Sequence, residues 1–316
     1  GPEEYFRLVQ KFTDELSNGP ADRIKLFLAP AGPQWCTEDL LRAIRREADV
    51  RDLGIQIHLL ETKYQRAYFS RTYNVSAVEW LDALGFLSPN VSLAHGVWLN
   101  ERDITLVARR GSSIIHNPSS NLRLKSGIAP VALFHAAGIP LALGMDSSTL
   151  NDDSDMLQEM RLCANLQRVP GLNSECIPLK EIFRMATVNG AKALGWGSLS
   201  GALAPNKRAD MILFDERSLS QPYLAAHQNP IDRLLYRGKA SSVDTVIVDG
   251  EILYRGKQHL RLKPKKILSD LVCSVIPALT DRGPSLETEL YPYVLRYYQA
   301  WDDETIIPHH KVNNIN

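Results

Sequence analysis

Short apolar runs alternate with stretches of helical periodicity through the first half of the chain. The strand-like runs are residues 23–29, 55–58, 91–95, 112–116 and 139–145. The helical stretches are residues 3–18, before the first run, and 37–49, 74–85, 100–110, 127–137 and 154–168, one after each run. Apolar spacing of this kind, changing repeatedly between strand and helix, predicts parallel βαβ units. We therefore expect an α/β fold with a parallel sheet.

The number of these units is unusual for the barrel that they suggest. Five strands are complete by residue 146, whereas a closed (β/α)8 barrel of the TIM type needs eight. The pattern predicts an incomplete barrel made of about the last five βα units. About three opening units would then be missing.

The pattern changes after about residue 180. Residues 179–194 are expected to form one helix, and residues 209–215 a strand. Residues 243–249 and 251–254 flank Asp249-Gly250, which is a strong hairpin signal. Helical spacing returns over residues 260–300. We predict a partial metal-dependent hydrolase barrel over residues 3–196, a small β-sandwich segment over 197–260, and a helical extension and tail over 261–316.

Composition narrows the class of protein and its expected partners. Apolar residues make up 44% of the chain and charged residues 23%, and the formal net charge is zero. This is the composition of a globular protein and gives no reason to expect nucleic acid or a membrane as a partner. No apolar run approaches the roughly 18 residues of a membrane span. Four widely spaced cysteines suggest a reducing compartment, so we expect a cytoplasmic location.

Four of the predicted strands end on a side chain that can bind metal or transfer a proton. These residues are His58, His95, His116 and Asp146. An α/β barrel builds its active site from residues at the carboxyl ends of its strands. Imidazole nitrogens and carboxylate oxygens are zinc ligands, and zinc activates water for hydrolysis. Glu61, three positions after His58, could relay a proton from the loop that follows the strand.

Each of these motifs also has a purely structural interpretation. An isolated His-x-x-Glu motif is usually a buried histidine and a solvated glutamate. The polar loop after His116 could brace the barrel mouth as readily as it could contact a substrate. Packing alone does not explain why His58, His95 and Asp146 agree in type and position at three separate strand ends. The agreement favours a metal site.

Several motifs in order resemble the amidohydrolase superfamily, in its cytosine/guanine deaminase and triazine hydrolase branch. They are HLLET at 58–62, LAHGVWL at 93–99, HNPSSNLRLKSGIAPV at 116–131 and LALGMDSSTLNDDSDM at 141–156. The resemblance implies that His58 is a metal ligand and Glu61 the acid that protonates the substrate ring. It implies that His95 orients the water, and in some members approaches the metal. Asp146 is similar to the carboxylate that binds metal and accepts the proton of the water.

The resemblance implies one divalent metal ion, with zinc as the first choice and iron as the alternative. The chain departs from the family in one respect, because members carry a His-x-His pair at the end of the first strand. No such pair occurs in this sequence, and the adjacent His309-His310 pair has the wrong spacing. We expect either a homo-oligomer, a dimer being plausible from the resemblance, or association with a missing N-terminal segment.

These observations predict a metal-dependent hydrolase that deaminates a small nitrogen heterocycle, such as a purine, pyrimidine, pterin or triazine. Its substrate-binding candidates are Gln34, Trp35, His116 and Asn151. A dechlorinating or amide-cleaving hydrolase of the same family is an alternative. A non-catalytic binding or scaffold protein is another, favoured by the missing His-x-His pair. Retention of His58, Glu61, His95 and Asp146 favours the enzyme. Whether this fragment is active alone stays open.

Overall fold

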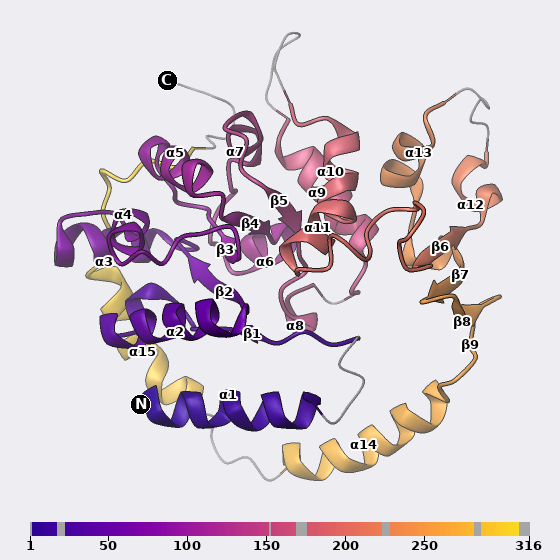
Figure 1. The fold of residues 1–316 in the computed structure, drawn as a ribbon, viewed down its shortest axis with the longest axis horizontal. Helices are drawn as coiled ribbons and strands as arrows, with labels where there is room; N and C mark the ends of the chain where they lie inside the picture. The colour runs from indigo at the N-terminus through magenta and orange to yellow at the C-terminus, as the bar shows by residue number, and fades with distance from the viewer. Residues whose placement is uncertain are drawn as a thin grey trace.

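A five-stranded parallel sheet is the centre of the fold. The computed structural model describes residues 2–17, 23–151, 153–168, 176–222, 228–280 and 286–309. The strands lie side by side in chain order: β1 (Phe27–Leu28), β2 (Gly54–Leu59), β3 (Val91–His95), β4 (Ser113–His116) and β5 (Leu141–Leu143). All five predicted strands are confirmed, although β1 and β5 are shorter than expected (Figure 1). The α/β class and the incomplete barrel of five units are therefore correct.

One helix precedes β1, and the other helices follow the strands of this sheet as βαβ units require. They are α1 (Pro2–Ser17), η1 (Pro33–Trp35), α2 (Glu38–Arg51), α3 (Lys63–Tyr73), α4 (Ala77–Ala83), α5 (Glu101–Arg110), α6 (Pro118–Arg123), α7 (Val131–Ala136), α8 (Ser148–Asn151), α9 (Met156–Leu166), α10 (Leu179–Met185) and α11 (Val188–Ala193). Side-chain caps fix where several of them begin: Ser76 and Asn100 each form a capping box with an acidic residue three positions on.

Two helical predictions differ from the structure. We predicted one helix over residues 74–85, but Asn74 has a left-handed backbone that ends α3, and Ser76 then caps a separate helix, α4. The helix α3 itself was not predicted. We also predicted one helix over residues 179–194, which is divided into α10 and α11 because Thr187 leaves helical geometry.

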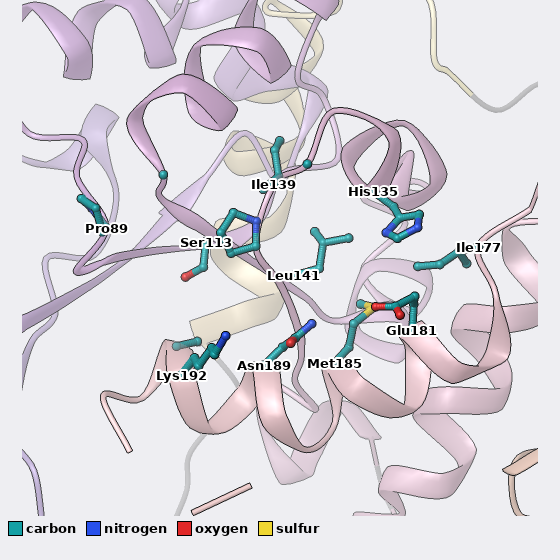
Figure 2. A pocket seen from close by; sticks show the side chains of 14 residues that line it. Pro89, Ser113, His135, Ile139, Leu141, Ile177, Glu181, Met185, Asn189 and Lys192 are labelled. Atoms are coloured by element: carbon teal, nitrogen blue, oxygen red, sulfur yellow. The ribbon is translucent and has the colours of Figure 1, made fainter. Parts of the chain in front are cut away.

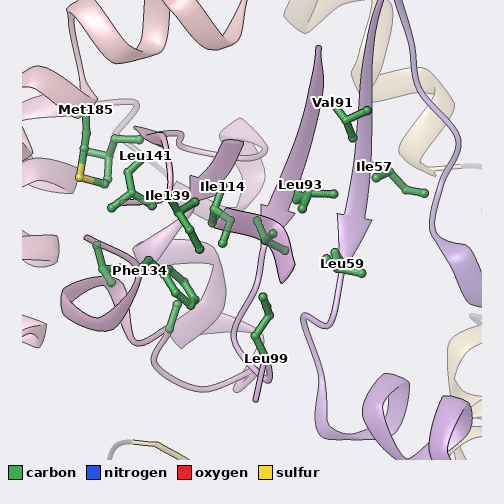
Figure 3. Close-up of a cluster of buried hydrophobic side chains, with 14 of the residues drawn as sticks. Ile57, Leu59, Val91, Leu93, Leu99, Ile114, Phe134, Ile139, Leu141 and Met185 are labelled. Atoms are coloured by element: carbon green, nitrogen blue, oxygen red, sulfur yellow. The ribbon is translucent and has the colours of Figure 1, made fainter. Parts of the chain in front are cut away.

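The two faces of the parallel sheet have different side chains. Ile57, Leu59 and Leu93 are almost completely buried against the helices and belong to the main hydrophobic core (Figure 3). Removing such a side chain from water stabilises the fold by about 1.5–3 kcal/mol. The alternate residues Gln56 and Ser92 line a cavity on the other face. This alternation follows from the two-residue period of a strand.

A second, antiparallel sheet follows along the chain. It contains β6 (Met211–Phe214), β7 (Val243–Val248), β8 (Glu251–Arg255) and β9 (Gln258–His259) in that order. Helices α12 (Glu216–Ser220) and α13 (Pro230–Arg237) and the turn η2 (Ala240–Ser242) lie between β6 and β7. The predicted hairpin is confirmed, since Asp249 and Gly250 both have positive φ at the turn between β7 and β8. The domain boundaries and the sandwich form stay predictions.

Two helices follow the second sheet, and the end of the later one lies against α3. They are α14 (Pro264–Thr280) and α15 (Leu286–Gln299). The Trp301 ring, just after α15, lies 5.5 Å from the Tyr64 ring of α3. Figure 1 places the β6–β9 sheet and the α3–α4 pair at opposite sides of the molecule. Among the described residues, no helix has both the length and the apolar character needed to cross a membrane.

Candidate active site

The carboxyl ends of β2, β3 and β5 meet at one cavity. Its volume is about 480 Å³, and side chains from the face of the sheet opposite the core line it. His58, His95 and Asp146 are among the lining residues, together with Asn117 from the end of β4. In a parallel sheet the carboxyl ends of the strands share one edge, so residues that follow different strands come together there.

The His58 ring is held by the loop after the neighbouring strand. Its Nδ1 donates a hydrogen bond to the backbone oxygen of Ala31 at 2.5 Å, and the His58 backbone nitrogen donates to the same oxygen at 3.4 Å. A carbonyl can only accept, so Nδ1 carries the proton and Nε2 keeps its lone pair. Metal-binding histidines are usually oriented by a hydrogen bond of this kind.

The His95 ring is held in the same way and lies at the centre of the cluster. Its exposed fraction is 1%, and Nδ1 donates to Asn121 Oδ1 at 2.8 Å. The other nitrogen, Nε2, lies 3.9 Å from Glu61 Oε2 and 4.0 Å from Asp146 Oδ2. The His58 and His95 rings are stacked, with centroids 5.5 Å apart and planes inclined by 16°. The four residues therefore face one region of space.

Three residues at these strand ends have a backbone conformation that L-amino acids seldom adopt. The φ angles are 45° at Leu60, 75° at His95 and 63° at Asp146. Such residues cost about 1–3 kcal/mol each and cluster at functional sites. Hydrogen bonds from Gly96 N to Leu59 O and from Trp98 N to Leu60 O hold the turns at 3.0 and 2.9 Å. The strain indicates that the position of these side chains matters more than local stability.

Serine hydroxyls position the carboxylates of Asp146 and Glu61. Ser120 Oγ donates to Asp146 Oδ2 at 2.6 Å, and Ser126 Oγ donates to Glu61 Oε1 at 3.3 Å. The Glu61 backbone nitrogen donates to Gln65 Oε1 at 2.6 Å. Sequence reasoning missed these positioning roles. The signal that could have found them is the density of serine and asparagine in the segment after His116, which contains Ser120 and Ser126.

The four predicted substrate-binding residues lie around the site but not on its surface. Gln34 and Trp35 belong to η1, which follows β1, and the exposed fraction of Trp35 is 59%. His116 is fully buried at the end of β4. Within the described chain, the cavity lining includes neither these three residues nor Asn151. Their contact with substrate stays a prediction.

Asn151 instead belongs to a buried polar cluster. Its Nδ2 donates to Ser119 Oγ at 3.3 Å and also to the carboxylate of Glu159. That carboxylate accepts hydrogen bonds from the backbone nitrogen of Ser119 at 3.2 Å and from its hydroxyl. Glu159 on α9 thereby fastens the start of α6, which carries the asparagine that orients His95.

Glu159 makes the stability of the protein depend on pH. Its side chain is fully buried, and burial raises its pKa, an effect only partly offset by the hydrogen bonds from Ser119 and Asn151. A raised pKa means that the folded state binds the proton more tightly than the unfolded chain. The stabilisation is therefore complete below the unfolded pKa of about 4.3 and is lost as pH rises through the folded pKa.

We expect Glu159→Gln to remove this pH dependence. Urea unfolding at several pH values above 4 should show the free energy of unfolding of the wild type falling relative to that of Glu159→Gln as pH rises. Ser119→Ala removes a hydrogen bond that lowers the pKa of Glu159 and should make the fall steeper. Parallel pH profiles for all three proteins would contradict the interpretation.

A second cavity lies at the opposite ends of the strands. It has a volume of about 460 Å³ and is lined by the first residues of β4 and β5, Ser113 and Leu141. Figure 2 shows His135 and Glu181 at one side of it and Lys192 at another. None of the four converging residues lines it. Amino ends of barrel strands serve stability more often than chemistry, so the first cavity is the candidate site.

The converging side chains suit a divalent metal ion in type and orientation. Two imidazoles with Nδ1 engaged by outer partners, and a carboxylate beside them, are common zinc donors. In the part of the chain that the structure describes, however, no three His, Cys, Asp or Glu residues are spaced to hold a metal ion. Of the adjacent pair near the chain end, His309 Nε2 bonds the backbone oxygen of Leu99. His310 lies outside the described residues.

The chain is similar to known proteins over most of its length. Residues 2–253 match the model of the amidohydrolase family. A 5'-deoxyadenosine deaminase of Methanothermobacter thermautotrophicus is 39% identical over 247 residues, covering 78% of this chain and 57% of the relative. A 5-methylthioadenosine/S-adenosylhomocysteine deaminase of Thermococcus onnurineus is 38% identical over 245 residues, covering 78% and 56%.

A solved structure is also similar over most of the chain. It is an adenosine deaminase from Xanthomonas campestris with bound zinc, with a TM-score of 0.79 and 28% identity, covering 85% of this chain and 60% of that one. The chain thus spans little more than half the length of the relatives that it matches.

Proposed function

The chain belongs to the amidohydrolase family, and from this premise we propose that it carries the acid–base part of a metal-dependent deaminase site for a purine nucleoside. The observation that carries the proposal is the convergence of His58, Glu61, His95 and Asp146 at the carboxyl ends of β2, β3 and β5. The names of the two relatives support an adenine nucleoside as the substrate. The zinc in the similar adenosine deaminase supports zinc as the metal.

His58 and Asp146 would hold the metal ion, with His95 beside them. A divalent ion bound there lowers the pKa of water toward neutrality and so supplies a nucleophile at neutral pH. The hydrogen bond to Ala31 and the one to Asn121 fix the two imidazoles before the metal arrives. No His-x-His pair is present in these 316 residues, so His58, His95 and Asp146 are the donors that this chain itself would offer.

Glu61 and Asp146 move the protons of the reaction. Asp146 accepts a proton from the water that adds to the amino-bearing ring carbon, and His95 orients that water through Nε2. Glu61 delivers a proton to the adjacent ring nitrogen, which makes the carbon more electrophilic. Asp146 then returns its proton to the amino group, the C–N bond breaks and ammonia leaves. The hydroxyl left on the ring loses its proton to Glu61, so the ring keeps the oxygen of the water as a carbonyl. Ser126 and Ser120 donate hydrogen bonds to the two carboxylates and so restrict their positions.

Two further features belong to the same proposal. The outer edges of β1 and β5 each lack a strand neighbour within the described sheet, and unpaired strand edges favour association. A second copy of this chain is one partner that could cover those edges. The predicted cytoplasmic location stays a prediction.

The experiment that tests the function is ammonia release by the zinc-loaded protein. We expect 5'-deoxyadenosine or methylthioadenosine to release one ammonia per nucleoside converted, and a chelator to abolish the reaction. A chlorotriazine serves as the comparison substrate, with release of chloride as its readout. Binding of the nucleosides without ammonia release would instead favour a non-catalytic binding protein, and faster chloride release would favour a dechlorinating enzyme.

A further inference from the structure

A third cavity, called the hollow below, lies beside the segment that hydrogen-bonds Glu61. Its volume is about 400 Å³, and it lies between the loop after β2 and the carboxyl end of α15. The lining residues that matter here are Tyr64, Trp98, Lys125, Ser126, Tyr298 and Trp301. They come from the start of α3, from the segments after β3 and after α6, and from the helical extension.

The hollow is joined to Glu61 by direct contacts. Ser126, which lines the hollow, donates its hydroxyl hydrogen bond to Glu61. Trp98 donates from its indole nitrogen to the Ser126 backbone oxygen at 2.7 Å, and from its backbone nitrogen to Leu60 at 2.9 Å. A molecule in the hollow therefore lies on the same loops that carry the proposed acid.

The outer wall of the hollow is anchored to the barrel. The Tyr64 ring meets the rings of Tyr298 and Trp301 edge to face, at 5.1 and 5.5 Å between centroids. Lys63 Nζ bonds Asp302 at 2.8 Å, and Arg71 donates to the Ala300 backbone oxygen at 3.0 Å. Aromatic contacts of this geometry contribute about 0.5–1.5 kcal/mol each beyond their buried area. The wall is thus held against α3 by several independent contacts.

The lining chemistry selects a particular kind of ligand group. Tyr64, Trp98 and Tyr298 offer ring faces or edges to a flat or apolar stem. Asp302 neutralises Lys63, whereas Lys125 has no ion pair with any residue that the structure describes. A lysine beside aromatic rings suits an anionic group attached to such a stem.

We propose that this hollow is a subsite that binds an anionic group carried on a planar or apolar stem, with Lys125 meeting the charge and Tyr298 the stem. As a place for part of the substrate, it rests on the proposed deaminase function. The anion could be a phosphate or a carboxylate, since Lys125 meets either as a point charge.

A pair of probes without a nucleobase tests the subsite by itself. Naphthylacetate and naphthylacetamide share a stem and differ in charge, and quenching of tryptophan emission in the full chain reports their binding. We expect the wild type to prefer the anion. Lys125→Met should weaken naphthylacetate about fivefold, as for a partly exposed charge pair of about 1 kcal/mol, and change naphthylacetamide less than twofold. Tyr298→Ala should weaken both probes.

The matched control is Lys180→Met, an equally charged substitution on the exposed side of α10 away from the hollow. It should change neither affinity. Equal affinity of the wild type for both probes, no binding of either, or the same effect of Lys125→Met and Lys180→Met would overturn the proposal.

Nucleosides then separate the two possible anions and the two proposals. A nucleoside 5'-phosphate and a nucleoside with a carboxylate-bearing thioether tail are compared with a neutral 5'-deoxynucleoside. The charged nucleoside whose affinity falls in Lys125→Met carries the anionic group that the hollow binds. If the naphthyl probes behave as expected and no nucleoside binds, the deaminase function fails while the subsite stands. If Lys125→Met leaves the affinity for every nucleoside unchanged, the substrate does not reach the hollow. The hollow is then not part of the deaminase site.

Discussion

Replacing Glu61 by glutamine is expected to lower the rate of ammonia release by roughly 10²- to 10⁴-fold, the range for loss of a general acid–base group. Glutamine keeps the size of the side chain and can still accept the hydrogen bond that Ser126 donates. It cannot carry a proton to the ring nitrogen. The structure of the site and its metal content should therefore be unchanged while the proton transfer is lost.

The measurement is the steady-state rate of the zinc-loaded protein, with zinc content determined on the same sample. Glu38→Gln is the control, because Glu38 lies on the exposed side of α2 and pairs with Arg42 of the same helix. It should retain the wild-type rate. A Glu61→Gln protein with the wild-type rate would remove Glu61 from the mechanism.

Asp146→Asn is expected to produce the largest loss of zinc affinity. The substitution removes the only carboxylate charge proposed as a ligand, and an amide is a much weaker donor to zinc. We expect zinc affinity to fall by more than about 10²-fold, which is the upper range for loss of an outer hydrogen-bonding partner. Asn121→Ala removes such an outer partner, the one that orients His95, and should lower affinity by roughly 10- to 100-fold.

Competition with a chromophoric zinc chelator measures both variants. The order of the two effects is the informative result, since a general loss of folding would reduce both alike. Zinc affinity in Asp146→Asn equal to that of the wild type would show that the carboxylate is not a ligand.

The strands of the first sheet were predictable because they are short, mostly apolar runs separated by stretches of helical spacing. Val91 to His95 is buried along its whole length, and the run is visible in the sequence. The helix α3 lacks such a signature. Its buried positions include Gln65 and Ala67, and its aromatic residues pack against Trp301, more than 200 positions away. Local periodicity contains no information about that contact.

The candidate site was predictable for a related reason. His58, His95 and Asp146 each end a strand, and parallel strands place their ends at one edge. The loop residues that position these groups have no such rule. The hydrogen bond from Asn151 to Glu159 could not be predicted, because the path of the segment between β5 and α9 depends on packing against α6.

The convergence of His58, His95 and Asp146 on one divalent ion is the central claim, and anomalous diffraction from zinc-soaked crystals tests it most directly. The account predicts one zinc peak in the cavity at the carboxyl ends of β2, β3 and β5, within coordination distance of His58 and Asp146 and next to His95. A zinc peak only elsewhere, or no peak in that cavity at saturating zinc, would contradict it.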